Sequence, residues 1–322
     1  YLAFNPRTIP YSVVEPDWDE KSKLDLQVSE TTFLSAIENL FQEDNRLAIC
    51  TISDLNNKFT LLGQLKIFGS NLVHASDDLK NDREIVLIAV KNDGSAFEYA
   101  GDELKSDREI VLTALRHNIH YLKYADDELK SDREFVLTAV ITHSGIALEY
   151  ADDELKSDRK FVLTAVTHSS FALMYASEEL QSDREVVLTA VRKSGSALQY
   201  ASDELKNDRE VVLTAVKNEG SALRYASEEL WGDREIILTA VKGDGSAFEY
   251  TTSEELWGDR EIVLTAVKSC GGALSQVGDE FKGDREIVLT AVKSDGSALK
   301  FASEALKSDK EIVLAAVRND KY

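Results

Sequence analysis

The stretch DREVVLTAVRKSGSALQYASDELKN, residues 183–207, is one copy of a unit that recurs along most of the chain. The first Asp of the unit lies at positions 82, 107, 132, 158, 183, 208, 233, 259, 284 and 309. Ten copies therefore follow one another at intervals of 25 or 26 residues, and the longer intervals add one residue near positions 142–144 and another at 251–252. A spacing of roughly 20 to 50 residues, kept over many copies, is the signature of a repeat architecture.

The first half of each unit predicts an α-helix. Its apolar run, such as residues 110–115, would also suit a strand, but Ser106 and Glu109 before it match a capping box, in which the Ser side chain accepts from a backbone N–H of the first turn. Asn or Gly replaces this Ser in other copies. A basic residue and a glycine such as Gly94 or Gly220 follow the run and are typical of a helix end. We therefore expect a helix of about eleven residues in each unit.

The second half of each unit has room only for shorter helices. In residues 221–230, about one and a half helical turns are followed by Ser227-Glu228-Glu229-Leu230, which predicts a further capped turn. The first helix is apolar on almost every side, so it must be covered by its own short helix and by the first helices of both neighbouring units. The sequence therefore predicts an all-α fold, a curved α-solenoid of about ten repeats on the order of 80–100 Å long.

The N-terminal residues depart from the repeat. Residues 1–28 contain all three prolines and predict an extended arm, residues 29–56 predict N-terminal capping helices, and residues 57–81 match a degenerate first repeat. The ten-repeat solenoid occupies residues 82–322. The sequence ends directly after the first helix of the tenth unit with no capping segment, so we expect the native protein to continue past this point.

Composition disfavours several classes of function. The 322 residues include 37 Lys and Arg against 58 Asp and Glu, which gives a net charge of −21, and 43% of them are hydrophobic. Nucleic acids and anionic membranes are bound through clustered Lys and Arg, so neither is an expected partner. No apolar run approaches the roughly 18 residues that span a bilayer. Cys50 and Cys270 provide neither a disulfide framework nor a paired metal site, and we expect an intracellular location, cytoplasmic or organellar.

The pattern Asp-Arg-Glu, an apolar residue, Val-Leu-x-Ala-Val, and then Gly-x-Ala-Leu-x-Tyr-Ala-Ser-x-Glu-Leu-Lys resembles a known helical repeat family of about 25 residues per unit. That family is known only as a domain of unknown function, and it occurs in arrays in intracellular bacteria, including their secreted effectors, and in algae and other protists. The resemblance is strong over residues 82–322, weak over 57–81 and absent from 1–56. It implies a helical repeat fold and supplies no catalytic residues. More distantly, the unit is similar to the leucine-rich-variant solenoids.

Three periodic columns of polar side chains are interpreted as structural. An Arg beside a Glu, such as Arg209, predicts an ion-pair ladder between the N-termini of adjacent helices. Paired acids such as Asp203 and Glu204 place negative charge in the first turn of a short helix. A Tyr such as Tyr200 is expected to pack between units with its hydroxyl outward. Equivalent carboxylate pairs in every unit do not offer the two different environments that acid–base catalysis requires.

The second to fourth units depart from the pattern in the turn after the first helix, where the usual Asp-Gly gives way to less acidic and more apolar residues. The candidate partner-binding residues of these turns are His117, His120, His143, His168 and Phe171. His117, His143 and His168 occupy successive units, and a spacing of about 10 Å is too long for a shared metal ion. Cys270 has no His nearby in the sequence that would activate it as a nucleophile.

Trp231 and Trp257 are two further candidate partner-binding residues. Each lies two residues before the Asp of the next unit, where most copies have Lys. The change from Lys to Trp in two successive units either adjusts the packing around the extra residue at 251–252 or creates a hot spot for a partner. The sequence is compatible with both interpretations.

The function expected from the sequence is a non-enzymatic one. An α-solenoid offers an extended surface, and the chain has no nucleophile–base pair, Gly-rich phosphate loop or metal-ligand spacing, so no catalytic residue, cofactor or metal is assigned. We expect a protein–protein interaction scaffold or a bridging subunit of a larger assembly, whose protein partner presents a basic surface. The alternative is a targeting module of a larger multidomain protein, such as a bacterial effector in the host cytosol, with any catalytic domain outside this segment.

Overall fold

The computed structural model describes residue 65 and residues 68–319. All regular elements of these residues are α-helices or 3-10 helices, and no strand occurs among them. The elements repeat with the period of the sequence, so the predicted all-α solenoid is confirmed. The arm expected at 1–28 and the capping helices expected at 29–56 lie outside the described residues, as do residues 57–64 of the expected first repeat.

Each repeat contains a ten-residue α-helix, a 3-10 helix and a short third helix. The long helices are α4 (Arg83–Asn92), α5 (Arg108–His117), α7 (Arg133–Thr142), α9 (Arg159–His168), α11 (Arg184–Lys193), α13 (Arg209–Asn218), α14 (Arg234–Gly243), α16 (Arg260–Ser269), α18 (Arg285–Ser294) and α20 (Lys310–Asn319). The 3-10 helices that follow them are η4 (Gly94–Tyr99), η6 (Ile119–Tyr124), η7 (Gly145–Tyr150), η8 (Ser170–Tyr175), η9 (Gly195–Tyr200), η10 (Gly220–Tyr225), η12 (Gly245–Tyr250), η13 (Gly271–Ser275) and η14 (Gly296–Phe301).

The third helix of each repeat has only four or five residues. These short helices are η5 (Asp102–Ser106), α6 (Asp127–Ser131), α8 (Asp153–Ser157), α10 (Glu178–Gln181), α12 (Asp203–Lys206), η11 (Glu228–Gly232), α15 (Glu254–Trp257), α17 (Asp279–Lys282) and α19 (Glu304–Lys307). Before α4, η3 (Gly69–His74) and α3 (Asp77–Lys80) have the same order of a 3-10 helix and a short helix. The second half of the unit is therefore already present before the first Asp-Arg-Glu.

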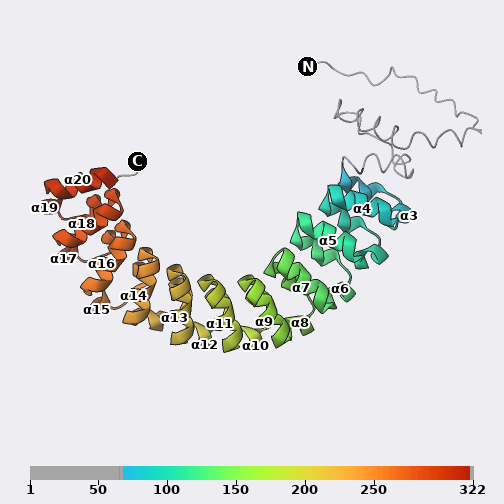
Figure 1. Ribbon diagram of the computed structural model, residues 1–322, viewed down its shortest axis with the longest axis horizontal. Helices are drawn as coiled ribbons and strands as arrows, with labels where there is room; N and C mark the ends of the chain where they lie inside the picture. The colour runs from blue at the N-terminus through green and yellow to red at the C-terminus, as the bar shows by residue number, and fades with distance from the viewer. Residues whose placement is uncertain (1–64, 66–67, 320–322) are drawn as a thin grey trace, which may run out of the picture.

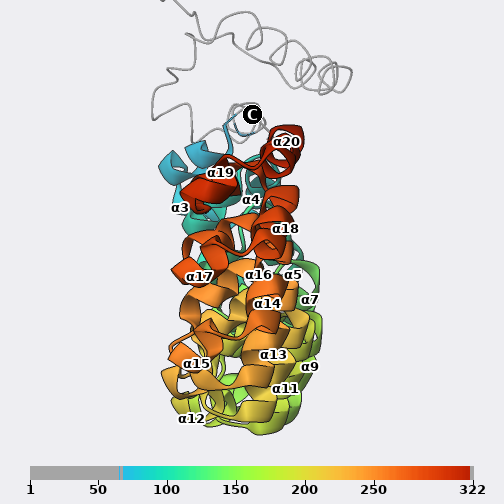
Figure 2. The same ribbon diagram turned by 90° about the vertical axis from the view of Figure 1, so that its left-hand side faces the viewer.

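The repeats stack side by side into an arc whose two ends lie on the same side (Figure 1). The short helices lie along the outer edge of the arc, and a view from one end shows them opposite the long helices (Figure 2). Most of the described long helices pack between two 3-10 helices, their own and that of the preceding repeat, as α11 does between η8 and η9. Successive long helices also contact one another directly.

One continuous apolar core runs the length of this stack. From α4 to α18 each long helix buries at least four of its ten positions, as in α13 with Val211, Val212, Ala215 and Val216, none more than 1% exposed. The 3-10 helix adds an Ala and a Leu or Phe, such as Ala222 and Leu223 in η10, both fully buried. Because every repeat is covered by its neighbours, the stability of each depends on the interfaces with the next.

The long helices begin one residue later than a capping box would place them. Asp107, not Ser106, is the N-cap of α5, and its carboxylate accepts from the backbone N–H groups of Glu109 and Ile110. Ser106 is the last residue of the preceding short helix η5. The capping-box prediction was therefore wrong, because the Asp binds the N–H groups of the first turn and adds a negative charge where the helix dipole favours it.

The glycines after the long helices do not end them through a left-handed conformation. No described residue has a positive φ, and the residue before Gly220, Glu219, already has extended backbone angles. Gly220 instead begins η10 where the end of α14 packs against it, and a Cβ atom there would lie only 2.7 Å from the backbone nitrogen of Asp244. This position needs glycine because two repeats approach each other closely.

Candidate interaction surface

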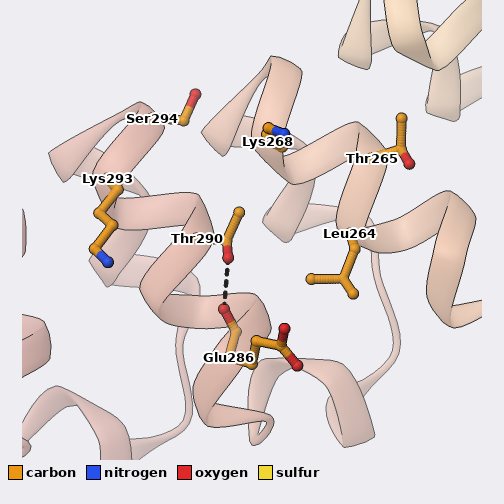
Figure 3. A pocket seen from close by; sticks show the side chains of 7 residues that line it. All are labelled: Leu264, Thr265, Lys268, Glu286, Thr290, Lys293 and Ser294. Atoms are coloured by element: carbon orange, nitrogen blue, oxygen red, sulfur yellow. Dashed lines mark hydrogen bonds between the residues drawn. The ribbon is translucent and has the colours of Figure 1, made fainter.

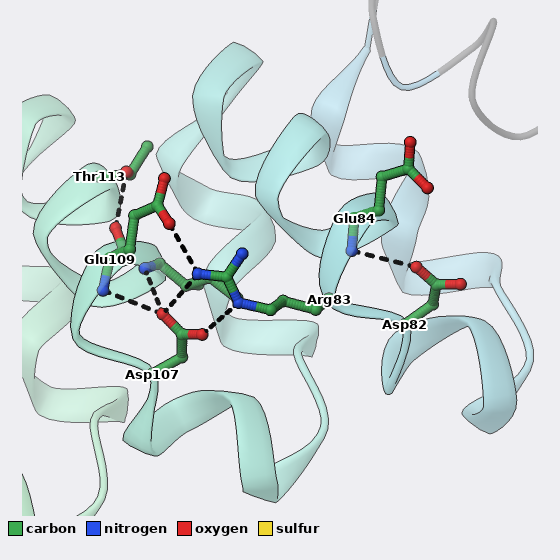
Figure 4. Close-up of polar contacts among 7 residues, drawn as sticks. Asp82, Arg83, Glu84, Asp107, Glu109 and Thr113 are labelled. Carbon is green, nitrogen blue, oxygen red and sulfur yellow. Dashed lines mark hydrogen bonds and ion pairs between the residues drawn. The ribbon is translucent and has the colours of Figure 1, made fainter.

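The predicted ion-pair ladder is confirmed, and it joins each repeat to the next. Arg83, the first residue of α4, donates from Nε to Asp107 Oδ2 and from Nη2 to Glu109 Oε2, both at 2.6 Å (Figure 4). Asp107 is also the N-cap of α5, so one carboxylate caps a helix and binds the previous repeat. The arginines that contact both the Asp and the Glu of the next repeat are Arg83, Arg159, Arg184, Arg209, Arg234, Arg260 and Arg285.

The ladder is thinner in the second and third repeats. Arg133 bonds only to Asp158, at 2.5 and 3.2 Å, because Lys160 stands where the next repeat would normally supply Glu. This guanidinium and the backbone N–H of Phe161 lower the pKa of Asp158 to about 2. Arg108 likewise pairs only with Asp132. These pairs are partly exposed, so each contributes little to stability on its own and the ladder is structural.

The paired acids of the short helices form an acidic outer edge. Asp102 and Glu103 begin η5, and the Asp102 carboxylate is 3.2 Å from Lys105 Nζ while its side chain is almost fully exposed. Five other short helices pair their first acid with the Lys three residues later in the same way, through Lys130, Lys156, Lys206, Lys282 and Lys307. Within the residues that the structure describes, His, Cys, Asp and Glu side chains form no group of three or more that could hold a metal ion.

The tyrosines at the ends of the 3-10 helices are half-buried and pack against the core. Burial raises the pKa of Tyr200, as it does for Tyr150 and Tyr175 in the preceding two repeats. A neutral phenol at the edge of an interface between repeats fits a packing role with the hydroxyl at the surface.

Trp231 and Trp257 both donate to backbone carbonyls. The Trp231 indole N–H lies 3.3 Å from Leu223 O, and its ring packs at 5.5 Å from the Tyr250 ring of the next repeat. The Trp257 N–H lies 2.8 Å from Thr251 O, at the extra residue of that repeat. Gln181, at the equivalent position, similarly donates to three carbonyls. These bonds favour the packing interpretation of the two tryptophans, although the Trp257 side chain remains 47% exposed.

The histidines do not come together in one site. His120 Nδ1 is 2.6 Å from the hydroxyl of Tyr150 in the next repeat, whereas His143 Nδ1 is 2.6 Å from Thr142 Oγ1. Burial lowers the pKa of His143. His117 and His168 are exposed last residues of α5 and α9. His120 thus contacts the next repeat, and His143 contacts a residue of its own repeat.

Phe171 lies in an apolar surface that the sequence analysis found only in part. Its side chain is 47% exposed, and Met174 in the same 3-10 helix is 43% exposed. Ile141 near the end of α7 is 49% exposed. Neither Met174 nor Ile141 was singled out, although other repeats have charged or polar residues at their positions, so a comparison between repeats would have found them.

The hollows on the described surface are shallow and shared between repeats. One of about 540 Å³ lies between α16 and α18 and is lined by Leu264, Thr265 and Lys268 on one helix and by Glu286, Thr290, Lys293 and Ser294 on the other (Figure 3). Its side chains are the ordinary residues of the repeat, and the Thr290 hydroxyl is occupied by a bond to Glu286 O. The hollow is part of a ridged surface that many repeats share. Its residues do not indicate a specific site.

These features define the class of protein, an α-solenoid whose repeats are joined by a core and a ladder of ion pairs. A family model described as "Domain of unknown function (DUF4116)" matches six times in tandem, at residues 65–105, 107–144, 139–181, 183–231, 233–282 and 284–322. The chain belongs to this family, so the resemblance is confirmed. No curated protein and no solved structure matches the chain. Among the described helices, none combines the length and apolar character needed to cross a membrane.

Proposed function

We propose that the chain is a non-enzymatic scaffold that binds another protein along the arc, as a linking subunit of a larger assembly inside a cell. The observation that carries the proposal is the acidic outer edge, where every short helix from η5 to α17 begins with two acidic residues. The described surface offers this edge at a regular spacing over the length of the arc (Figure 1).

A repeated edge of this kind favours a partner with Lys and Arg on its surface. Opposite charges accelerate encounter and set the register of a complex, and many weak contacts along one rod add up through multivalency. The exposed pairs are screened by salt over a Debye length of about 8 Å at physiological ionic strength, so association should slow as salt rises. The net charge of −21 acts in the same direction.

The proposal is tested by isolating the native complex and mapping its contacts by cross-linking and mass spectrometry. The expected result is a stoichiometric protein partner whose lysines cross-link to carboxylates of the short helices, with an association rate that falls as salt is raised. A chain that is recovered without a partner, or that turns over a small molecule in isolation, would contradict the scaffold. Duplex DNA serves as a negative control, because its phosphates are repelled by the same carboxylates.

A further inference from the structure

A row of half-buried or exposed side chains on the 3-10 helices changes character in the second to fourth repeats. The second residue of the 3-10 helix is Ser in five repeats, namely Ser95, Ser196, Ser221, Ser246 and Ser297. The corresponding residues of η6, η7 and η8 are His120, Ile146 and Phe171. Polar positions therefore become aromatic or aliphatic in three consecutive repeats.

Two of these residues, Ile146 and Phe171, form one surface with Met174 and Tyr200, which we call the apolar row; Phe171 and Met174 are exposed, and Ile146 and Tyr200 are half-buried. Phe171 and Met174 are three residues apart, so they lie on the same face of η8, because a 3-10 helix has three residues per turn. The Phe171 ring lies 5.6 Å from the ring of Tyr200 in the next repeat. On the other side, Gly145 beside Ile146 packs so closely against η8 that a Cβ atom there would lie 3.0 Å from the Phe171 carbonyl carbon.

The core under the apolar row does not require these side chains. Ala172 and Leu173 of η8 are fully buried, as are Ala222 and Leu223 of η10, where the flanking surface residues are the half-buried Ser221 and the exposed Arg224. The same backbone and the same core are thus built with polar residues at the surface positions. Exposed aromatic and methionine side chains that the fold does not need are enriched in binding surfaces.

Carboxylates border the apolar row toward the outer edge. The short helix α10 packs directly against it, since Gln181 Nε2 donates to Met174 O at 3.1 Å. Glu178 and Glu179 of α10 are exposed, and they form no ion pair with any described residue. Glu149 lies on η7, three residues after Ile146. Burial is the largest cause that raises the pKa of Tyr175, and the nearby Glu149 carboxylate raises it further. An apolar centre beside carboxylates that form no ion pair with a described residue is complementary to a segment that combines apolar side chains with Lys or Arg.

We propose that the apolar row binds an amphipathic helix of a partner protein, with apolar residues on Ile146, Phe171 and Met174 and basic residues on Glu178 and Glu179. The inference rests on the proposed scaffold and names where its partner is recognised. Neighbouring repeats are about 10 Å apart, and residues seven apart on an α-helix are separated by nearly the same distance, so one helical face meets successive repeats. A surface of this kind recognises a helix through apolar side chains that are spaced along one face of that helix.

The test uses a fluorescein-labelled peptide of about 18 residues with a Leu/Phe stripe and a Lys face, long enough to cross two repeats. Binding is followed by fluorescence anisotropy with the full chain and with the triple variant Ile146→Ser, Phe171→Ser, Met174→Glu. Each new residue is one that other repeats carry at that position, so we expect an unchanged circular dichroism spectrum and affinity at least about tenfold weaker. Affinity unchanged by the triple variant would overturn the proposal.

Two matched controls separate the parts of the proposal. A peptide with Glu in place of Lys should bind more weakly, and equal or tighter binding would overturn the assignment of the acidic border. The variant Ser196→Ile, Ser221→Phe, Arg224→Met moves the apolar row to η9 and η10, and it should restore binding to the triple variant. Failure to restore binding in a folded protein would also count against the apolar row as the determinant.

The native partner distinguishes this inference from the scaffold itself. A partner that binds the triple variant as well as the parent would overturn the apolar row and leave the scaffold standing. Absence of any partner would remove the scaffold, whatever the peptide does.

Discussion

The repeats built on α5, α7 and α9 and those built on α11, α13 and α14 have the same fold and different surfaces. In both groups the long helix buries an apolar residue, a Val or Ile, an Ala and a final apolar residue. Phe135 and Phe161 replace Ile or Val in the first group and are still only 1% exposed. The surface positions differ, since that group has the thinner ion-pair ladder and three of the four residues of the apolar row, Ile146, Phe171 and Met174.

The core and the surface of a repeat therefore vary independently. The core positions must fit both neighbours, so they stay apolar and buried along the stack even where Phe replaces Ile or Val. The surface positions have no such constraint, and the apolar residues at these positions in η7 and η8 are a property of that segment alone. If the two groups differed in stability, their cores would not be equivalent; if they differed only in binding, recognition would lie in the surface positions.

Deletion of repeats has the largest expected effect. Removing residues 158–182 from the first group or 183–207 from the second takes out one complete unit and keeps the register, so both products should remain helical with reduced stability. Removing only residues 183–194 leaves half a unit and should unfold the neighbouring repeats. Circular dichroism with thermal melting distinguishes the outcomes. If whole-unit and half-unit deletions unfolded alike, the repeats would not be independent units.

Glycine substitutions come next. Gly220→Ala should lower the free energy of unfolding by about 2 kcal/mol, because the new methyl group would clash with the backbone of α14. Gly145→Ala should cost a similar amount, since its Cβ would lie 2.5 Å from Ala172 N. Gly232→Ala is the control, because nothing lies within 4 Å of its Cβ position. Urea titration measures all three, and equal stability of the three variants would contradict the close approach.

A smaller effect is expected at the ladder, and it depends on pH. The pKa of Asp158 is about 2 in the folded chain and about 3.9 in an unfolded one, so its contribution is present above about pH 4 and is lost as the pH falls toward 2. Asp158→Asn should therefore lower stability at pH 7 by less than about 1 kcal/mol and approach the parent at low pH. Denaturant titrations at several pH values, repeated in the Arg133→Gln background, provide a double-mutant cycle.

In that background the effect of Asp158→Asn should shrink, because the guanidinium that lowers the pKa is absent. An effect that is independent of both pH and Arg133 would assign the role of Asp158 to helix capping alone.

The tryptophans are expected to be structural and modest in effect. Trp231→Lys should lose the contact with Tyr250 and the bond to Leu223 O, whereas Trp257→Lys gives up only an exposed ring and one bond. We therefore expect a loss of about 1 kcal/mol for Trp231 and less for Trp257, with affinity for the partner nearly unchanged. Affinity weakened by more than about 2 kcal/mol, with stability intact, would instead make the tryptophans a hot spot.

The smallest predicted effect is the repair of the ladder. Lys160→Glu would give Arg133 the second carboxylate that arginines such as Arg159 already contact. Exposed pairs of this kind contribute about 0.2–1 kcal/mol, so the variant should be slightly more stable than the parent at low salt and equal to it at high salt. A thermal shift measured at both salt concentrations tests it. A loss of stability would mean that Lys160 has a favourable partner elsewhere.

The architecture could be predicted because it depends on residues that recur. Ten copies of Asp-Arg-Glu or a close variant set the register, and the period placed each Arg opposite the acids of the next helix. The N-cap could not be assigned in the same way, because both Ser106 and Asp107 precede the helix and only the structure places Ser106 inside η5. Gly220 was misread because its constraint comes from α14, which follows it in the chain and packs against it.

The candidate surface could be predicted only in part. Phe171 and the histidines stood out because they replace the Asp-Gly turn, but Ile146 and Met174 occupy positions whose exposure depends on the 3-10 geometry of η7 and η8. The side chains of the tryptophans point to backbone carbonyls, which no sequence pattern indicates.

Hydrogen–deuterium exchange of the full chain, with and without the amphipathic Lys peptide, tests whether surface residues of one group of repeats recognise a partner. We expect slower exchange in η7 and η8, residues 145–150 and 170–175, with η10 and η12 unchanged. Slower exchange spread evenly over all repeats would contradict this expectation, because the acidic edge common to every repeat would then account for binding without the apolar row. Slower exchange confined to η10 and η12 would contradict it as well, because binding would then occur away from the apolar row.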